Sequence, residues 1–70
     1  MNIKIRNKIS RIRRSEEFNL SQGELANRVG VSRVRISQVE NGGTPSAELM
    51  LKLSIFFNKD AREIFSLEKV

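Results

Sequence analysis

The sequence has 70 residues and contains neither cysteine nor histidine. A chain of this length predicts one domain over residues 1–70, and the missing residue types exclude a disulfide framework, a thiolate zinc site and the commonest general base. We therefore expect no enzyme, no metal and no cofactor. No apolar run approaches the roughly 20 residues of a membrane-spanning helix, so we expect a cytoplasmic protein without a membrane partner.

The positive charge is concentrated in the first half of the chain. Residues 1–35 carry nine Lys or Arg against three Glu, a net charge of +6, whereas the whole chain carries +5. Such asymmetry favours a polyanionic partner, first nucleic acid and second an acidic membrane surface. A solvated basic face is the plainer alternative.

The first predicted element is an amphipathic helix that ends near Ser15. Ile5, Ile9 and Ile12 recur at spacings of four and three residues, with Lys and Arg between them, which is typical of a helix. Ile3 and Ile5 also alternate with polar residues, so a short strand is the alternative.

The next helix, residues 22–29, has a complete start signal. Ser21 is the expected N-cap, and Glu24 stands three residues later, as a capping box requires. Gly30 follows the last apolar residue and suits the left-handed conformation at a helix C-terminus. The sequence therefore predicts a two-turn helix followed by a sharp turn.

Two further helices follow after short connections. Ser32 is the expected cap of a helix over residues 33–40. Pro45 suits the first turn of a fourth helix, whose cap is Thr44 or Ser46. That fourth helix carries apolar side chains at helical spacing on one face, namely Leu49, Met50, Leu53, Phe56 and Phe57.

The chain is predicted to close with a short fifth helix. Asn58 is expected to end the fourth helix in a left-handed conformation, and Asp60 to cap the fifth. Ile64 and Phe65 are then expected to fold back onto the core.

The two helices between residues 21 and 41 have the spacing of a helix-turn-helix unit, whose second helix enters the DNA major groove. Ala26 allows a close helix crossing and Gly30 makes the turn. The expected shared core consists of Leu25, Val29, Val31, Ile36 and Val39. A helical hairpin without DNA-binding function is the alternative.

The helical projection predicts which side chains are exposed on the second helix of this unit, residues 33–40. With Ile36 and Val39 turned inward, Val34, Ser37, Gln38 and Asn41 point outward, flanked by Arg33 and Arg35. Arginine suits guanine, glutamine suits adenine, and valine suits a thymine methyl. We expect base contacts from Arg33 and Gln38. Val34 suits a thymine methyl or is only incidentally exposed, and Arg35 suits a base or a phosphate equally. Gln22, at a helix N-terminus, suits a phosphate.

The sequence resembles the Cro and phage-repressor type of helix-turn-helix regulators, also called the xenobiotic-response-element type. The resemblance lies in LSQGELANRVGVSRVRISQVENG at 20–42, PSAELMLKLSIFFN at 45–58 and EIF at 63–65. It implies an all-α fold of five helices, a compact Cro/repressor-type domain, that binds double-stranded DNA as a homodimer on a pseudo-palindromic operator. We predict a transcriptional repressor that inserts residues 33–40 into the major groove.

The resemblance also implies roles for single residues. Gln22 matches a glutamine that binds phosphate and braces the recognition helix. Arg33, Val34 and Gln38 match the main base-reading positions of the family, and Ser37 matches an auxiliary base contact. Asn41 and Gly42 match a backbone contact in the loop. The expected DNA-backbone contacts are thus Gln22, Ser32, Arg35, Asn41 and Gly42.

One feature departs from the family pattern, and it concerns the partner of Glu40. Where the family often has an arginine that pairs with the equivalent of Glu40, this chain has Ser15. Matching the isoleucines aligns Arg13 with that position instead.

Dimer contacts are expected from Ile55, Ile64, Phe65, Leu67 and Val70. The alternative function is an antitoxin or another protein-interaction module of a toxin–antitoxin or restriction–modification operon, with a protein partner and autoregulatory DNA binding.

Overall fold

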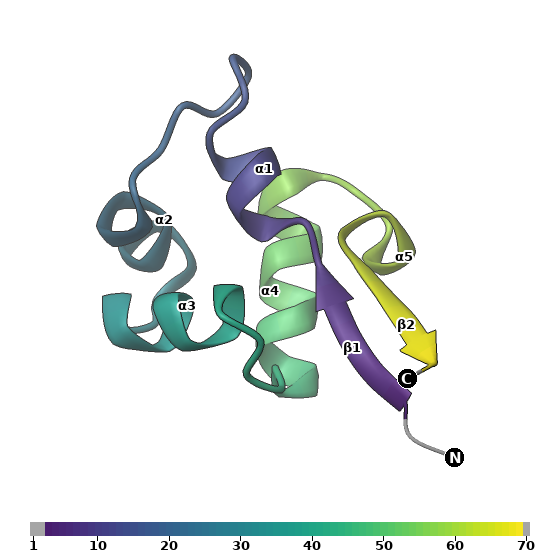
Figure 1. Ribbon diagram of the computed structural model, residues 1–70. Coiled ribbons are helices and arrows are strands. Elements are labelled where there is room, and N and C mark those ends of the chain that lie inside the picture. Colours follow the sequence, from purple (N-terminus) through teal and green to yellow (C-terminus); the bar gives the residue numbers. More distant parts are fainter. Residues whose placement is uncertain (1–2, 70) are drawn as a thin grey trace.

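The computed structural model describes residues 3–69 and contains five helices flanked by two strands (Figure 1). Among these residues, no helix is long and apolar enough to cross a bilayer. The elements in chain order are β1 (Ile3–Asn7), α1 (Ile9–Arg13), α2 (Gln22–Val29), α3 (Arg33–Glu40), α4 (Ala47–Phe57), α5 (Ala61–Ile64) and β2 (Phe65–Lys69).

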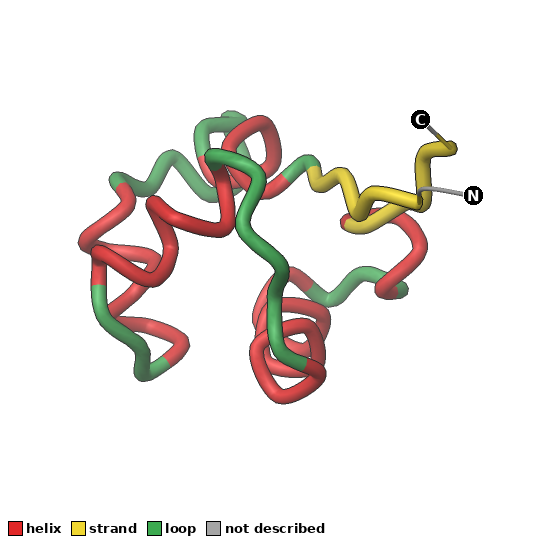
Figure 2. The backbone as a smooth tube through the Cα atoms, turned by 60° about the horizontal axis from the view of Figure 1, so that its bottom comes forward, coloured by secondary structure: helices red, strands yellow, loops and turns green. Residues whose placement is uncertain are grey.

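The expectation of an all-α fold is wrong, because the two ends of the described chain form an antiparallel two-stranded sheet. Ile3 pairs with Lys69, and Asn7 pairs with Phe65. The strands lie together at one edge of the group of helices (Figure 2). The five expected helices are present, so the fold class differs from the prediction in the two strands that flank them.

The helix predicted up to Ser15 is shorter than expected and begins only at Ile9. Asn7 explains the boundary, since its Oδ1 accepts a hydrogen bond from the Ile9 N–H at 3.1 Å and its Nδ2 donates one to the Val39 carbonyl at 2.9 Å. The strand alternative is therefore correct for Ile3–Asn7. Ile5 packs against the core from the strand, where the side chains alternate.

The predicted helix caps are confirmed. Ser21 and Glu24 form a reciprocal capping box on α2, and Gly30 ends that helix with φ 76°. Ser46, and not Thr44, caps α4. Asp60 caps α5 and forms a second capping box, with Glu63.

The core lies between the helices and the inner face of the sheet. As expected, Ile64 and Phe65 fold back into it, and Phe18 in the α1–α2 connection packs its ring against Phe57 at 5.0 Å between centroids. The buried apolar side chains are Ile9, Leu25, Ala26, Val29, Ile36, Val39, Leu49, Leu53, Phe57, Ile64 and Phe65. This packing holds α2 and α3 in one orientation and leaves the outer face of α3 uncovered.

Candidate nucleic-acid interface

The outer face of α3 gathers the side chains predicted to contact bases. Ile36 and Val39 are fully buried, whereas Val34 is 57% exposed. Arg33 and Gln38 are also exposed, and Ser37 is half-buried. Together with Arg35, Asn41 and Gly43, these four residues line one shallow hollow along the helix. The projection from the sequence is thus confirmed, while the base contacts themselves stay predictions.

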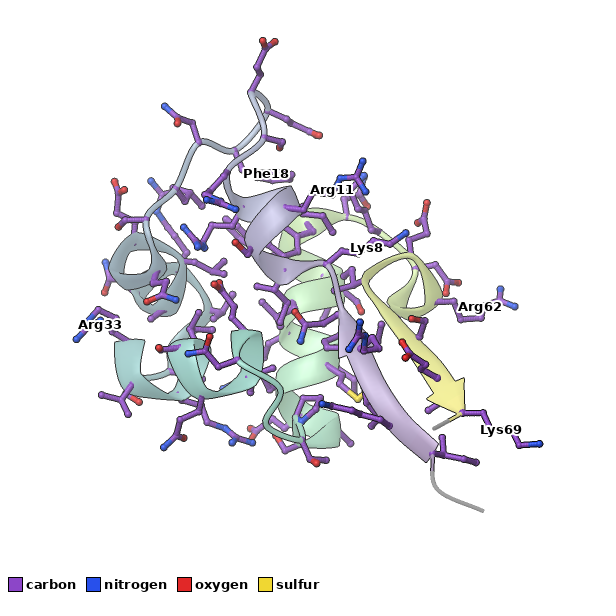
Figure 3. The ribbon with its side chains drawn as sticks, viewed as in Figure 1. Lys8, Arg11, Phe18, Arg33, Arg62 and Lys69 are labelled. Atoms are coloured by element: carbon purple, nitrogen blue, oxygen red, sulfur yellow. The ribbon has the colours of Figure 1, made fainter. Side chains whose placement is uncertain are left out.

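Arg33 lies at the free N-terminal end of α3, and its side chain points away from the protein (Figure 3). Ser32 caps the same end, where its Oγ accepts a hydrogen bond from the Arg35 N–H at 3.0 Å. The guanidinium of Arg35 donates to the Thr44 carbonyl at 3.2 Å. Arg35 therefore uses one donor to tie α3 to the loop before α4, and Arg33 is the more available cation.

Glu40, at the end of α3, is held by two other elements. Its carboxylate accepts hydrogen bonds from Nε and Nη2 of Arg13, at 2.9 and 3.1 Å, and from Nε2 of Gln22 at 3.1 Å. Both side chains of the ion pair are almost entirely buried. Arg13, and not Ser15, is therefore the partner of Glu40, and the brace expected from Gln22 is present.

The turn after α3 requires a close approach of two backbone segments. The Gly43 N–H donates to the Gln38 carbonyl at 2.8 Å. A Cβ at position 43 would lie only 2.8 Å from that same oxygen. The absence of a side chain at Gly43 thus lets the loop fold back against α3 and keeps Asn41 and Gly42 at the end of the exposed face.

One residue with a structural role near this interface was not selected from the sequence. Asn7 joins β1 to the last turn of α3 through its bond to the Val39 carbonyl. An asparagine after alternating isoleucines is a turn signal, but its partner is 32 residues away in the chain. The spacing of residues in the sequence cannot predict so distant a partner.

Two of the expected dimer contacts belong to the core instead. Ile64 is 1% exposed and Phe65 is 6% exposed, because α5 and the start of β2 cover the end of the helical core. Ile55 and Leu67 are 79% and 71% exposed, and they stay candidates. Val70 lies outside the described residues.

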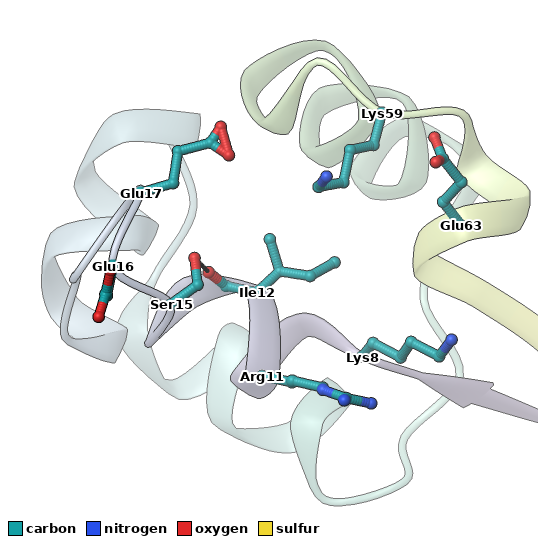
Figure 4. A pocket seen from close by; sticks show the side chains of 8 residues that line it. All are labelled: Lys8, Arg11, Ile12, Ser15, Glu16, Glu17, Lys59 and Glu63. Atoms are coloured by element: carbon teal, nitrogen blue, oxygen red, sulfur yellow. Dashed lines mark hydrogen bonds between the residues drawn. The ribbon is translucent and has the colours of Figure 1, made fainter.

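A second hollow, of about 700 Å³, lies between α1, the following loop and the start of α5 (Figure 4). Its charges balance, with Lys8, Arg11 and Lys59 opposite Glu16, Glu17 and Glu63. Within residues 3–69, no group of three or more acidic side chains is arranged to hold a metal ion. This hollow therefore offers neither a net charge for an anion nor a metal centre, and the face of α3 is the better site.

Comparison with known proteins agrees with this geometry. A family model described as helix-turn-helix matches residues 9–64. The chain is also 41% identical over 54 residues to an uncharacterized HTH-type transcriptional regulator of Archaeoglobus fulgidus, and the match covers 76% of each of the two chains.

Proposed function

Because the chain belongs to the Cro and phage-repressor type of DNA-binding helix-turn-helix regulators, we propose that it represses transcription by binding a specific pseudo-palindromic operator. We further propose that it has no catalytic activity and that its regulation depends on occupancy of the operator. The observation that carries the proposal is the outer face of α3. Its exposed side chains differ in chemistry, and buried contacts of Glu40 with Arg13 and Gln22 hold the helix in its orientation.

The exposed set can discriminate between bases. A guanidinium at Arg33 forms two parallel hydrogen bonds with guanine O6 and N7, and the Gln38 amide pairs with adenine N6 and N7. Val34 presents methyl groups that suit the thymine methyl. A surface that bound only phosphates would need charge alone, so a mixed set of this kind favours sequence reading.

The buried network behind α3 supports the same function. Gln22 starts α2, where unbonded backbone N–H groups favour a phosphate, and its side chain also bonds Glu40. A phosphate contact at α2 would thereby set the position of α3 in the groove. Backbone contacts position the protein, and base contacts specify the sequence.

A homodimer accounts for a two-fold operator, since two recognition helices about 34 Å apart enter successive major grooves. We place the dimer contact on β2. Leu67 is 71% exposed, and it borders an apolar hollow lined by Ile5, Met50, Ala61, Arg62, Phe65, Ser66 and Leu67.

Charge favours β2 over β1 as the strand that pairs with its own copy. An antiparallel two-fold pairing centred on Leu67 sets Leu67 opposite Leu67 of the partner subunit and Ser66 opposite Glu68 of the partner subunit, so no like charges meet. Pairings of β1 centred on Lys4, Ile5 or Arg6 all set two cations opposite each other, which is destabilising.

Selection from a randomised duplex pool tests the proposed function. The selected and scrambled duplexes are then titrated across a salt series. We expect a palindrome that is bound at least about 10³-fold more tightly than scrambled DNA. Equal affinity for all duplexes, falling steeply with salt, would reveal phosphate binding alone and would favour the protein-interaction alternative.

A further inference from the structure

Strand β1 places a lysine beside the recognition helix, although the two are far apart in the chain. A Cβ built at Gly42 would lie 3.8 Å from Nζ of Lys4 and 3.9 Å from its Cε. The ammonium group of Lys4 therefore lies close to Gly42, in the loop that directly follows α3. Gly42 has φ 103°, so a side chain at this position would be strained.

Lys4 and Gly42 border a hollow of about 350 Å³ that continues from the end of α3. Its other lining residues are Ile5, Arg6, Asn7, Glu40 and Asn41. Asn41 also lines the hollow along the outer face of α3. The two hollows thus meet at Asn41, and β1 forms the far wall of the second.

The charged neighbours of Lys4 are engaged elsewhere. Arg6 pairs with Glu68 at 2.9 Å, and Glu40 accepts hydrogen bonds from Arg13 and Gln22. Among residues 3–69, no carboxylate lies within 4.0 Å of the Lys4 ammonium group in an ion pair. Lys4 stands opposite Glu68 in the sheet register, but the Glu68 carboxylate pairs with Arg6. An exposed lysine that makes no ion pair, beside backbone that carries no side chain, suits a phosphate.

We propose that Lys4 binds a DNA phosphate at the edge of each half-site, so that β1 extends the backbone contact of the loop after α3. The proposal rests on the proposed function. It goes beyond the family comparison, because residues 3–7 lie outside the matched residues 9–64. Charge at Lys4 then adds affinity without adding base preference.

The competing role for Lys4 is structural. An ammonium group near the C-terminal end of a helix also interacts favourably with the helix dipole. Such an interaction would stabilise the fold but would not change how DNA binding depends on salt. The slope of log K against log salt concentration separates the two roles, since each phosphate contact contributes about 0.9 to it.

The experiment compares Lys4→Gln with the matched control Lys69→Gln. Both substitutions remove one positive charge from an exposed lysine of the sheet. Lys69 pairs with Ile3 in the register, so its side chain lies on the sheet face opposite to that of Lys4. The Lys69 side chain extends away from α3 and the loop that follows it (Figure 3).

For Lys4→Gln we expect weaker binding at 50 mM salt on operator and scrambled DNA alike, by about tenfold for each half-site and so about 100-fold for the dimer. The salt slope of the dimer should be smaller by about 1.8, which is about 0.9 for each of its two phosphate contacts. Lys69→Gln should keep the wild-type slope, and Lys4→Arg should restore it. An unchanged slope for Lys4→Gln overturns the contact, whether or not the melting temperature falls. If the wild-type protein prefers no duplex, the proposed function fails, while the slope difference on any duplex still decides the role of Lys4.

Discussion

Arg13 and Glu40 meet in a buried two-point contact, with Nε 2.9 Å from Oε2 and Nη2 3.1 Å from Oε1. The pair joins α1 to the last residue of α3, and Nη1 of Arg13 also donates to the Leu20 carbonyl at 2.9 Å. One guanidinium therefore connects α1, the entry to α2 and the end of α3. The ion pair lies behind the face of α3 that we propose to contact DNA, and it helps to hold that face in its orientation.

Removing one partner of this pair should destabilise the protein strongly. Arg13→Ala leaves the Glu40 carboxylate buried with Gln22 as its remaining side-chain partner, and we expect a loss of about 3–5 kcal/mol in the free energy of unfolding. Urea denaturation followed by circular dichroism measures the loss. Replacing both partners, Arg13→Met with Glu40→Leu, should recover most of it. A loss as small as that of the exposed neighbour variant Arg14→Ala would show that the pair contributes nothing.

The turn between α2 and α3 should be sensitive to backbone preference alone. Gly30 has φ 76°, and beyond its chain neighbours no atom lies within 4 Å of a Cβ built there, so the expected cost of a Cβ comes from the local backbone conformation. We expect Gly30→Val to lower the free energy of unfolding by at least about 1–2 kcal/mol, and Gly30→Asn by less, because asparagine tolerates this conformation. Equal melting temperatures for the two variants would contradict the explanation.

Gln38→Ala tests base reading by α3. We expect relaxed preference at one position of each half-site, with a loss of about 1–3 kcal/mol on the operator and little change on scrambled DNA. Titration of duplexes that vary that position measures the effect. Equal weakening on all duplexes would make Gln38 a phosphate contact instead.

Leu67→Glu tests the dimer on β2. The substitution sets two carboxylates opposite each other at the centre of the proposed pairing, so we expect a monomer by sedimentation, with the helical circular dichroism spectrum retained. Ile55→Glu, equally exposed but on α4, should stay dimeric. A monomer from Ile55→Glu with a dimer from Leu67→Glu would move the contact to α4.

The capping box of α2 predicts a small acid dependence of stability. The Ser21 N–H donates to the Glu24 carboxylate at 2.9 Å, and this bond is the main reason that the pKa of Glu24 lies below its ordinary value of 4.5. A lowered folded-state pKa means that the stabilisation is complete above pH 4.5 and is lost as the pH falls through the lowered pKa. Unfolding of Glu24→Gln between pH 5 and about 2 should therefore show a weaker pH dependence than wild type. Matching pH profiles would contradict this.

The helix-turn-helix unit could be predicted from the sequence because its signals are local. Ser21, Glu24 and Gly30 determine where α2 begins and ends through contacts within a few residues. The alternation between buried Ile36 and exposed Gln38 follows from the helical period alone. The positions of the expected base-contacting residues were therefore accessible without a structure.

The sheet and the partner of Glu40 depend on contacts between distant parts of the chain. Ile5 and Ile9 stand four residues apart, as a helix would require, although they belong to a strand and to the helix after it. Their separation alone cannot distinguish the two arrangements. Ile64 was predicted both to fold onto the core and to contact a dimer partner, and only its burial separates these roles.

The sheet also affects the order in which the chain folds. Its strands join Ile3 to Lys69, the two ends of the described chain, whereas α2 and α3 are neighbours in sequence. Closing so long a loop costs chain entropy before any strand contact forms. We therefore expect α2 and α3 to form early and the β1–β2 pairing to complete folding, which makes the strand that carries Lys4 the last part of the proposed interface to be assembled.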